Sequence, residues 1–347
     1  MSRLLIGKFF CNHQVAIIIL FAAGLCFGFT YKPELNEYEI HGYAQGTTYN
    51  IIYYAADTKV NKQQTDSLLE ELDKSVSLYR PASLINKFNT SPKGVYIDTL
   101  FKVLISRAIK INRQTDGMVD ITVKPLVDAW GFGAVKNTVK PDSAVIAKLK
   151  KYVGMSNLKL VGNYLSKKRP EVQIDLNGIA QGYSADLLAE LLEQKGIYNY
   201  MIEIGGELRV KGTKADGDLF QIGIESVNVN DFDPQPMPKI VSLKQGAITT
   251  SGTYRKHVEA NGKEISHLIN PKTGYPVSNK MISVTVCAGD AITADGFDNG
   301  FMLMGLTQTL KYLKDRTDIG AYIIYKQANG SIADTTTKGF NIMTITE

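Results

Sequence analysis

VQIDLNGIAQGYSADLLAELLEQKGIYNYMIEIGG, residues 172–206, is the stretch around which the rest of the chain is organised. Over 172–176 apolar residues alternate with polar ones, which is typical of a half-buried strand. Asn177 and Gly178 then break the strand and open a helix. This arrangement places Asp175 at a strand end beside the free N–H groups of a helix start. These are the parts of a phosphate or nucleotide site.

The helix in this stretch is predicted from apolar residues at helical spacing. They fall on one face made of Ala180, Tyr183, Leu187, Leu188, Leu191 and Leu192. Gly196 follows as a helix stop. Residues 200–204 read as a second strand, and it ends in Gly205 and Gly206, where something is expected to approach the backbone closely.

Composition places the chain among ordinary globular proteins. At 347 residues it can bury a large core, and 44% apolar with 21% charged residues are usual proportions. The net charge is +5, but no run of Lys and Arg forms a continuous basic stripe. We therefore expect no nucleic-acid partner.

The N-terminus has the layout of an export signal. Arg3 and Lys8 precede an uncharged apolar run over residues 15–29, which is short for a comfortable membrane span. We expect residues 1–30 to be a cleaved signal peptide. A retained membrane anchor and a lipid-modified Cys26 are the alternatives, although the residues before Cys26 fit a lipobox poorly. Export to the periplasmic side of the inner membrane follows as the expected location.

The remaining residues, 31–347, are expected to form one composite domain of α+β class with mixed, largely antiparallel sheets and packed helices. Strands and helices interleave irregularly, and Asn-Gly pairs at 261–262 and 329–330 indicate hairpins. Cys287, the body cysteine, lies in an apolar strand, so no disulfide framework is expected. The expected helices are 65–76, 98–115, 143–153, 291–304 and 307–316; the expected strands include 49–54, 220–224, 282–287, 321–325 and 341–345.

Two carboxylates with an amide suggest a metal site near the C-terminus. Asp295 and Asp298 are three residues apart and share one face of the expected helix with Asn299. Oxygen ligands of this kind suit Mg²⁺. The alternative is that these carboxylates complement the helix dipole, and the residues taken alone favour that alternative.

His267 is a second candidate, in the run SHLINP. It could serve as a general base or lie in a turn with its hydrogen bonds satisfied. Ser251 lacks the surroundings of a nucleophile elbow, and no zinc spacing, GxGxxG or Walker pattern is present. Trp130, between glycines, could line a pocket or anchor the core.

Taken together, these clusters resemble one family, the FAD:protein FMN transferases (ApbE family). The resemblance covers nearly all of the chain after the leader. The motifs that carry it, in order, are GTTYN, SLYRPASLINKFN, DGMVDITVKPLVDAWGFG, QIDLNGIAQGYSAD, IEIGGELRVKG, ITTSGTYRK, SHLINPKTGYPV and ADGFDNGFMLMG. It implies an exported, Mg²⁺-dependent enzyme that transfers the FMN half of FAD to a Thr or Ser hydroxyl of a target protein and releases AMP.

The resemblance also assigns roles to residues. It implies that Mg²⁺ is held by Asp295, by the side chain at 299 and by the backbone carbonyl of Gly178, with Asp298 in a supporting or second-metal position. Members of the family usually carry Thr where this chain has Asn299. Asn still offers an oxygen, so metal binding is expected to survive with altered affinity.

For FAD, the resemblance implies a cleft in which Tyr79 stacks on the flavin and Asp175 holds the adenosine side. Met is usual where this chain has Gln45. His267 becomes the expected activator of the acceptor hydroxyl, and Arg255 a weaker candidate for neutralising phosphate charge. The full FAD-binding set is Gln45, Tyr79, Met118, Val119, Asp120, Asp175, Gln181 and Ile269.

The expected acceptor is a membrane or periplasmic electron-transfer protein, such as a flavin-carrying subunit of a respiratory complex. Two other functions stay open at this point. One is an FAD pyrophosphatase that uses the same metal with water as nucleophile and produces FMN and AMP. The other is a flavin-binding or storage protein without turnover.

Overall fold

The computed structural model describes residues 34–133, 139–225, 239–253, 257–260 and 263–346. The chain from Asn36 to Glu347 is one compact unit. The predictions for the leader, for Cys26 and for Arg255 lie outside the described residues. Within the described ranges, no helix is both long and apolar enough to cross a membrane.

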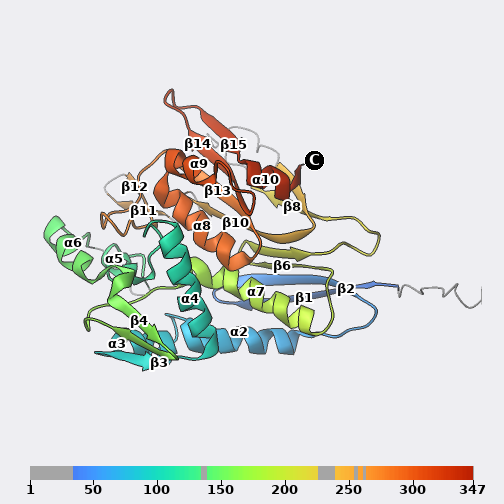
Figure 1. Ribbon diagram of the computed structural model, residues 1–347, viewed down its shortest axis with the longest axis horizontal. Helices are drawn as coiled ribbons and strands as arrows, with labels where there is room; N and C mark the ends of the chain where they lie inside the picture. Colours follow the sequence, from blue (N-terminus) through green and yellow to red (C-terminus); the bar gives the residue numbers. More distant parts are fainter. Residues whose placement is uncertain (1–33, 134–138, 226–238, 254–256, 261–262, 347) are drawn as a thin grey trace, which may run out of the picture. The chain divides into compact units, whose positions relative to one another are not determined.

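An antiparallel sheet runs through the molecule (Figure 1). Its strand order is β1-β2-β6-β7-β10-β13-β14-β15, and every neighbouring pair is antiparallel. This confirms the predicted α+β class. The strands are β1 Asn36–Ala44, β2 Thr47–Ala55, β6 Tyr200–Ile204, β7 Glu207–Lys211, β10 Gln245–Gly252, β13 Met281–Ala288, β14 Ile319–Lys326 and β15 Ile332–Thr336.

Smaller antiparallel sheets surround this one. They contain β8 Phe220–Ile224, β9 Lys239–Leu243 and β16 Ile345–Thr346; β3 Gly94–Tyr96, β4 Leu158–Val161 and β5 Tyr164–Lys167; and β11 His257–Ala260 with β12 Lys263–Ser266. β11 and β12 pair on either side of the Asn-Gly at 261–262. β14 and β15 form the other predicted hairpin, where Gly330 adopts a positive φ of 90°.

Two helices form the centre of the fold, α7 (Asn177–Gln194) and α8 (Ala291–Met304). α7 packs on β6 and β7, α8 packs on β10 and β13, and the two helices contact each other (Figure 1). The middle of α7 is therefore buried almost all round rather than on one face. The other helices are α2 Lys62–Val76, α3 Leu84–Thr90, α4 Thr99–Gln114, α5 Lys124–Ala129, α6 Ser143–Leu149, α9 Leu306–Leu313 and α10 Lys338–Met343.

Local signals set the helix ends. The Asp98 carboxylate accepts the Phe101 N–H at 2.8 Å and caps α4 as predicted. Gly196, with φ at 74°, ends α7 in the left-handed conformation that glycine adopts readily. α6 is shorter than its predicted range of 143–153, because the chain tightens into a 3₁₀ turn over Lys150–Tyr152.

The predicted strand over 172–176 is wrong. Its alternation is real, since Val172, Ile174 and Leu176 are buried. However, the segment pairs with no strand of the described chain. The side chain of Asn89 instead makes both backbone bonds of Ile174, accepting its N–H at 2.8 Å and donating to its carbonyl at 3.0 Å. A side-chain amide thus replaces a neighbouring strand.

The predicted strand over 341–345 is also wrong. α10 occupies most of it, and only Ile345–Thr346 is extended, as β16. A short apolar run does not distinguish helix from strand. Here Phe340 is fully buried, and Gly320 on β14 lets the backbone of Phe340 approach so closely that a Cβ would collide with it. The segment forms a helix rather than a strand because the helix allows this close contact with Gly320.

Candidate active site

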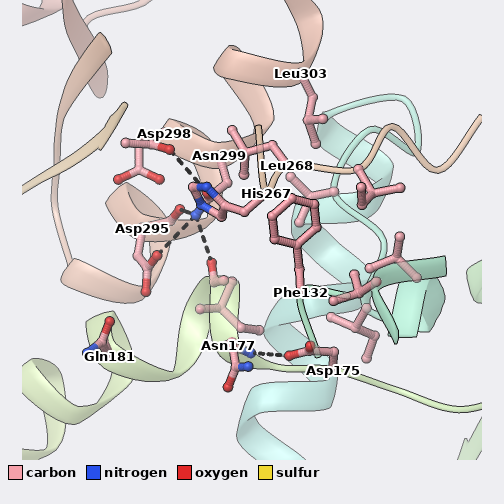
Figure 2. Close-up of a pocket in the computed structure, with 18 of the residues that line it drawn as sticks. Phe132, Asp175, Asn177, Gln181, His267, Leu268, Asp295, Asp298, Asn299 and Leu303 are labelled. Atoms are coloured by element: carbon pink, nitrogen blue, oxygen red, sulfur yellow. Dashed lines mark hydrogen bonds between the residues drawn. The ribbon is translucent and has the colours of Figure 1, made fainter. Parts of the chain in front are cut away.

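A cavity of about 370 Å³ lies where the first turn of α7, the middle of α8 and β10 meet. Its volume is within the usual range of small-molecule sites, about 300–1,000 Å³. Three other segments complete its walls, namely 118–127, 205–207 and 267–271. One part of the lining is apolar, with Met118, Val119, Ile179, Leu268, Ile269 and Leu303; the other is rich in oxygen, with Asp175, Gln181, Glu207, Asp295, Asp298 and Asn299 (Figure 2).

The start of α7 forms one wall. Asp175 is half-buried, and its carboxylate accepts the Asn177 N–H at 2.8 Å, which satisfies one free donor of the helix start. Burial raises the pKa of Asp175, and the Asn177 bond opposes that rise. Farther along, Gln181 lies over Gly205, where a Cβ would come within 2.6 Å of its Nε2 atom. Gly205, with φ at 66°, therefore leaves room for this close approach, as the sequence predicted.

α8 contributes two carboxylates, Asp295 and Asp298, that do not cap the N–H groups at its own N-terminus. Asp290 accepts the Thr293 N–H at 3.0 Å. Asp186, on α7, accepts the N–H groups of Ala291 and Ile292, each at 2.9 Å. These two residues satisfy the N–H groups of the helix start, whereas Asp295 and Asp298 lie beyond the first turn and line the cavity. The alternative, that they complement the helix dipole, is not supported by this geometry.

Asn299, itself a predicted metal ligand, is in contact with the other two, Gly178 and Asp295 (Figure 2). Its Nδ2 donates to the backbone carbonyl of Gly178 at 3.4 Å and to Asp295 Oδ1 at 3.4 Å. The second carboxylate oxygen of Asp295 accepts the Gly182 N–H at 2.9 Å. The side chain of Asn299 is thus hydrogen-bonded to Gly178 in the first turn of α7, although the two residues are 121 positions apart in the sequence.

The surroundings of Asp295 and Asp298 raise the pKa of both carboxyl groups. Asp295 and Asp298 are 4% and 2% exposed. Burial raises the pKa of Asp295 to about 7, and burial with the neighbouring Asp295 raises the pKa of Asp298 well above its usual value. Asp298 Oδ1 is buried without a well-formed hydrogen bond in the described structure, although the nearby Thr249 hydroxyl lowers the pKa of Asp298. A cation would relieve this buried charge.

Asp120 lines the cavity but uses its carboxylate for structure. Oδ1 accepts the Thr122 N–H at 2.8 Å, and Oδ2 accepts the Met155 N–H at 3.1 Å. The Thr122 hydroxyl in turn accepts the Gly154 N–H at 2.6 Å. These bonds hold the 118–123 wall in place, so Asp120 shapes the cavity rather than presenting a free carboxylate to it.

His267 lies in the cavity wall beside Phe132, whose ring it meets edge to face with centroids 6.5 Å apart (Figure 2). Phe132 packs on a small apolar cluster of Leu126, Ile146 and Ile269. Trp130 packs on the same cluster and donates from its indole to the Gly274 carbonyl at 2.9 Å. Trp130 is therefore an anchor for the wall that carries His267, and it does not line the cavity.

The structure brings together nearly all of the predicted site. The cavity is lined by Tyr79, Met118, Val119, Asp120, Asp175, Gly178, Gln181, His267, Ile269, Asp295, Asp298 and Asn299. Gln45 is not among the lining residues. It lies in the β1–β2 turn with φ at 54° and accepts the Ser184 hydroxyl at 3.0 Å, so its expected contact with FAD stays a prediction. Arg255 is outside the described residues.

This geometry can be compared with known proteins. The sequence matches the ApbE family over residues 45–323. The chain belongs to the ApbE family. Curated relatives include an FAD:protein FMN transferase of Vibrio cholerae, 38% identical and covering 85% of this chain and 88% of the relative. Another, from Haemophilus influenzae, is 32% identical and covers 87% and 90%.

Solved structures of the family share the fold. The flavin transferase ApbE from Vibrio cholerae superposes with a TM-score of 0.80 at 34% identity, covering 89% of this chain and 99% of that one. The apo form of the Pseudomonas stutzeri flavinyl transferase ApbE gives a TM-score of 0.79 at 30% identity, covering 89% and 97%. The family and fold inferred from the motifs are confirmed.

Sequence reasoning missed several residues that shape the site of this ApbE-family chain. The sequence around Ser251 argues against a nucleophile and gives it no other role, but its hydroxyl donates to Asn299 Oδ1 at 3.2 Å. Glu207 lines the cavity directly after the Gly pair, a position that could have marked it. Gly182 was also missed. A glycine inside a helical pattern is a signal for such a residue, because it usually has a packing or functional reason to be there.

Proposed function

We propose that this protein transfers the FMN half of FAD to a Thr or Ser hydroxyl of a target protein and releases AMP. Membership of a family whose curated relatives are FAD:protein FMN transferases supports the reaction class. Atom balance supplies the second product. FAD is FMN joined to AMP through a pyrophosphate, so moving the FMN half to a hydroxyl leaves AMP, with the hydroxyl proton as the other product.

The observation that carries the proposal is the meeting of Gly178, Asp295 and Asn299 at one point of the cavity wall. Carboxylate and carbonyl oxygens suit Mg²⁺, which typically takes one or two carboxylates and completes its shell with water and substrate phosphates. The poorly satisfied Asp298 Oδ1 nearby fits the same demand for positive charge. The described residues hold no cluster of three or more His, Cys, Asp and Glu side chains, so the proposed site relies on this carbonyl and amide.

We assign Gly178, Asp295 and Asn299 as the groups that would hold Mg²⁺, with Asp298 beside them. When bound there, Mg²⁺ would supply positive charge to the pyrophosphate of FAD, where negative charge gathers during phosphoryl transfer. The residues contribute by desolvation: both carboxylates are buried, so they attract a cation more strongly than carboxylates in water would.

The two halves of the cavity suit the two halves of FAD. The apolar wall around Met118, Val119 and Leu268 offers a surface for the flavin rings. Tyr79, 69% exposed at the edge of the cavity, is free to stack on them. Asp175 and Gln181, at the start of α7, are assigned to the adenosine side. The pyrophosphate then lies between α7 and α8.

His267 is assigned as the general base. In the proposed step, its imidazole takes the proton from the acceptor hydroxyl while the hydroxyl oxygen bonds to the phosphorus of the FMN half. The bond between that phosphorus and the bridging oxygen breaks, and AMP departs with the electron pair. Phe132 and the cluster behind it limit the motion of the His267 ring.

For location and partners, we propose an exported protein that acts on membrane or periplasmic electron-transfer proteins. The support is the charged and apolar layout of residues 1–30. Mass spectrometry of the mature N-terminus checks it, since a cleaved signal, a retained anchor and a lipidated Cys26 give different masses. An unprocessed N-terminus in cytoplasmic protein would contradict export.

The test of the residue roles uses the purified protein, FAD, Mg²⁺ and membranes from cells that lack this gene. His267→Ala is expected to bind FAD normally and to lose transfer by about 100-fold or more, because a general base contributes on that scale. Asp295→Ala is expected to lose Mg²⁺-dependent turnover. Unchanged transfer in either variant would remove that residue from its role.

A further inference from the structure

Three oxygen atoms face the side-chain nitrogen of Asn299. Nδ2 lies 3.4 Å from the Gly178 carbonyl, 3.0 Å from the Asp295 carbonyl and 3.4 Å from Asp295 Oδ1. On the opposite side of the same amide, the Ser251 hydroxyl donates to Oδ1 at 3.2 Å. The nitrogen side of the amide therefore faces three acceptor oxygens, and its oxygen side faces one hydroxyl group, that of Ser251.

An amide NH₂ and a cation are two ways of satisfying the same oxygens. Without positive charge or a donor, converging oxygens repel one another, and the NH₂ supplies two hydrogens to them. The two ends of an amide are nearly equal in size. A turn of about 180° about the Cβ–Cγ bond therefore exchanges nitrogen and oxygen without moving α8.

We propose that Asn299 is a two-position latch on the divalent-cation site, and that Ser251 is its positioning partner. With nitrogen inward the amide holds Gly178 and Asp295 together in the absence of a cation. With oxygen inward it completes the ligand set, and the Ser251 hydroxyl accepts the amide hydrogen that has turned toward it. This inference rests on the metal site proposed above.

The latch has a cost for cation binding. Turning the amide gives up its bonds to the Gly178 carbonyl, the Asp295 carbonyl and Asp295 Oδ1 before the oxygen can serve as a ligand. A Thr at position 299, the residue that the family resemblance makes usual there, offers a hydroxyl oxygen without any such turn. This chain should therefore bind divalent cations more weakly than its own Asn299→Thr variant.

The test is a titration of the EDTA-treated, FAD-free protein with Mn²⁺, in which electron paramagnetic resonance measures the unbound ion. The NH₂ group has two hydrogens to donate, and two hydrogen bonds of ordinary net strength correspond to roughly five- to 150-fold in a dissociation constant. Asn299→Thr is expected to lower the Mn²⁺ dissociation constant by that factor. Equal or weaker binding by Asn299→Thr would overturn the latch.

Ser251 is tested by a double-mutant cycle. Ser251→Ala leaves the turned amide with an unpaired N–H, which costs more than an under-used carbonyl oxygen. It should weaken Mn²⁺ binding by about three- to tenfold, and Ser251→Thr should restore it. In the Asn299→Thr background, Ser251→Ala should have no effect. Equal effects in both backgrounds would contradict the assignment of Ser251.

Thr285→Val is the matched control. Thr285 on β13 also carries a buried strand hydroxyl, but that hydroxyl pairs with Thr250 at 2.8 Å rather than with Asn299. Its loss should leave Mn²⁺ affinity unchanged. If the unsubstituted protein binds no more Mn²⁺ than Asp295→Ala, the metal assignment itself fails. If it binds more, but the Asn299 and Ser251 effects add independently, the latch alone fails.

Discussion

At the scale of single residues, Asp295 is a carboxylate whose ionisation the fold opposes. Burial raises its pKa from 3.8 to about 7, so between these values the folded protein keeps a proton that the unfolded chain has released. The free energy of unfolding of the metal-free protein should therefore fall as the pH rises through this window. Asp298 adds a change in the same direction.

We predict that Asp295→Asn, which cannot titrate there, loses much of this dependence. Urea unfolding of EDTA-treated protein from about pH 4 to about pH 8 checks it. The difference in unfolding free energy between the original protein and Asp295→Asn should favour the original at the acidic end and shrink toward neutral pH. A difference that stays constant across the range would show that Asp295 is ionised throughout.

Gly182 is the residue that lets α7 and α8 approach each other. A Cβ at this position would collide with the Ala291 carbonyl and come within 2.7 Å of the Asp295 Cβ. We predict that Gly182→Ala destabilises the protein by about 1–3 kcal/mol, the range found for overpacked cores. It should also weaken Mn²⁺ binding, because the Gly182 N–H holds Asp295 Oδ2.

Chemical denaturation and Mn²⁺ titration measure both effects of this substitution. Glu190→Ala is the control, since Glu190 is an exposed residue of the same helix. If Gly182→Ala left stability and Mn²⁺ affinity as they are in the control, the close packing of the two helices would not be what positions Asp295.

At the scale of elements, the segment 172–176 shows where sequence reasoning succeeds and fails. Its alternation predicted the buried side chains correctly, because burial depends only on which residues face the core. It could not predict that Asn89, on helix α3 and 85 residues before Ile174, takes the place of a neighbouring strand. The apolar run before the C-terminus failed similarly, since only contact with Gly320 on β14 decides that Phe340 lies in a helix.

Lys167 on β5 strengthens the same segment. Its ammonium is buried, donates to the carbonyls of Asn89 at 3.1 Å and Val172 at 2.8 Å, and lies 5.0 Å from the centre of the Phe88 ring. Desolvation lowers its pKa to about 8. Asn89 and Lys167 together hold the chain that leads into α7, so they set the position of Asp175 and Gly178.

We predict that Asn89→Leu, which keeps the size of the side chain, destabilises the protein by about 2–4 kcal/mol, because it leaves the N–H and carbonyl of Ile174 unpaired in the core. Guanidinium unfolding measures the loss. Thr90→Ala is the matched control on the same helix, since Thr90 is exposed and bonds only within its own helix in the described structure. Equal stability of the two variants would contradict the role of Asn89.

At the scale of the whole molecule, the set of family motifs in their sequence order predicted more of the site than hydrophobic periodicity could. The helices α7, predicted to stop at Gly196, and α8, predicted over 291–304, were both predicted from the residues alone. The meeting of Gly178 with Asp295 did not, because it depends on packing between elements more than a hundred residues apart, and only resemblance to the ApbE family supplied it. Ser251 and Gly182 escaped both routes, since their importance lies in contacts with Asn299 and Asp295 that no local pattern displays.

The most direct test of the central claim is flavin transfer itself. Purified protein, FAD and Mg²⁺ are incubated with membranes from cells that lack this gene, and the proteins are separated under denaturing conditions. We predict a fluorescent flavin band, FMN on a Thr or Ser residue by peptide mass spectrometry, and one AMP released for each FMN attached. Free FMN and AMP without a labelled protein, or FAD bound and unchanged, would contradict the claim.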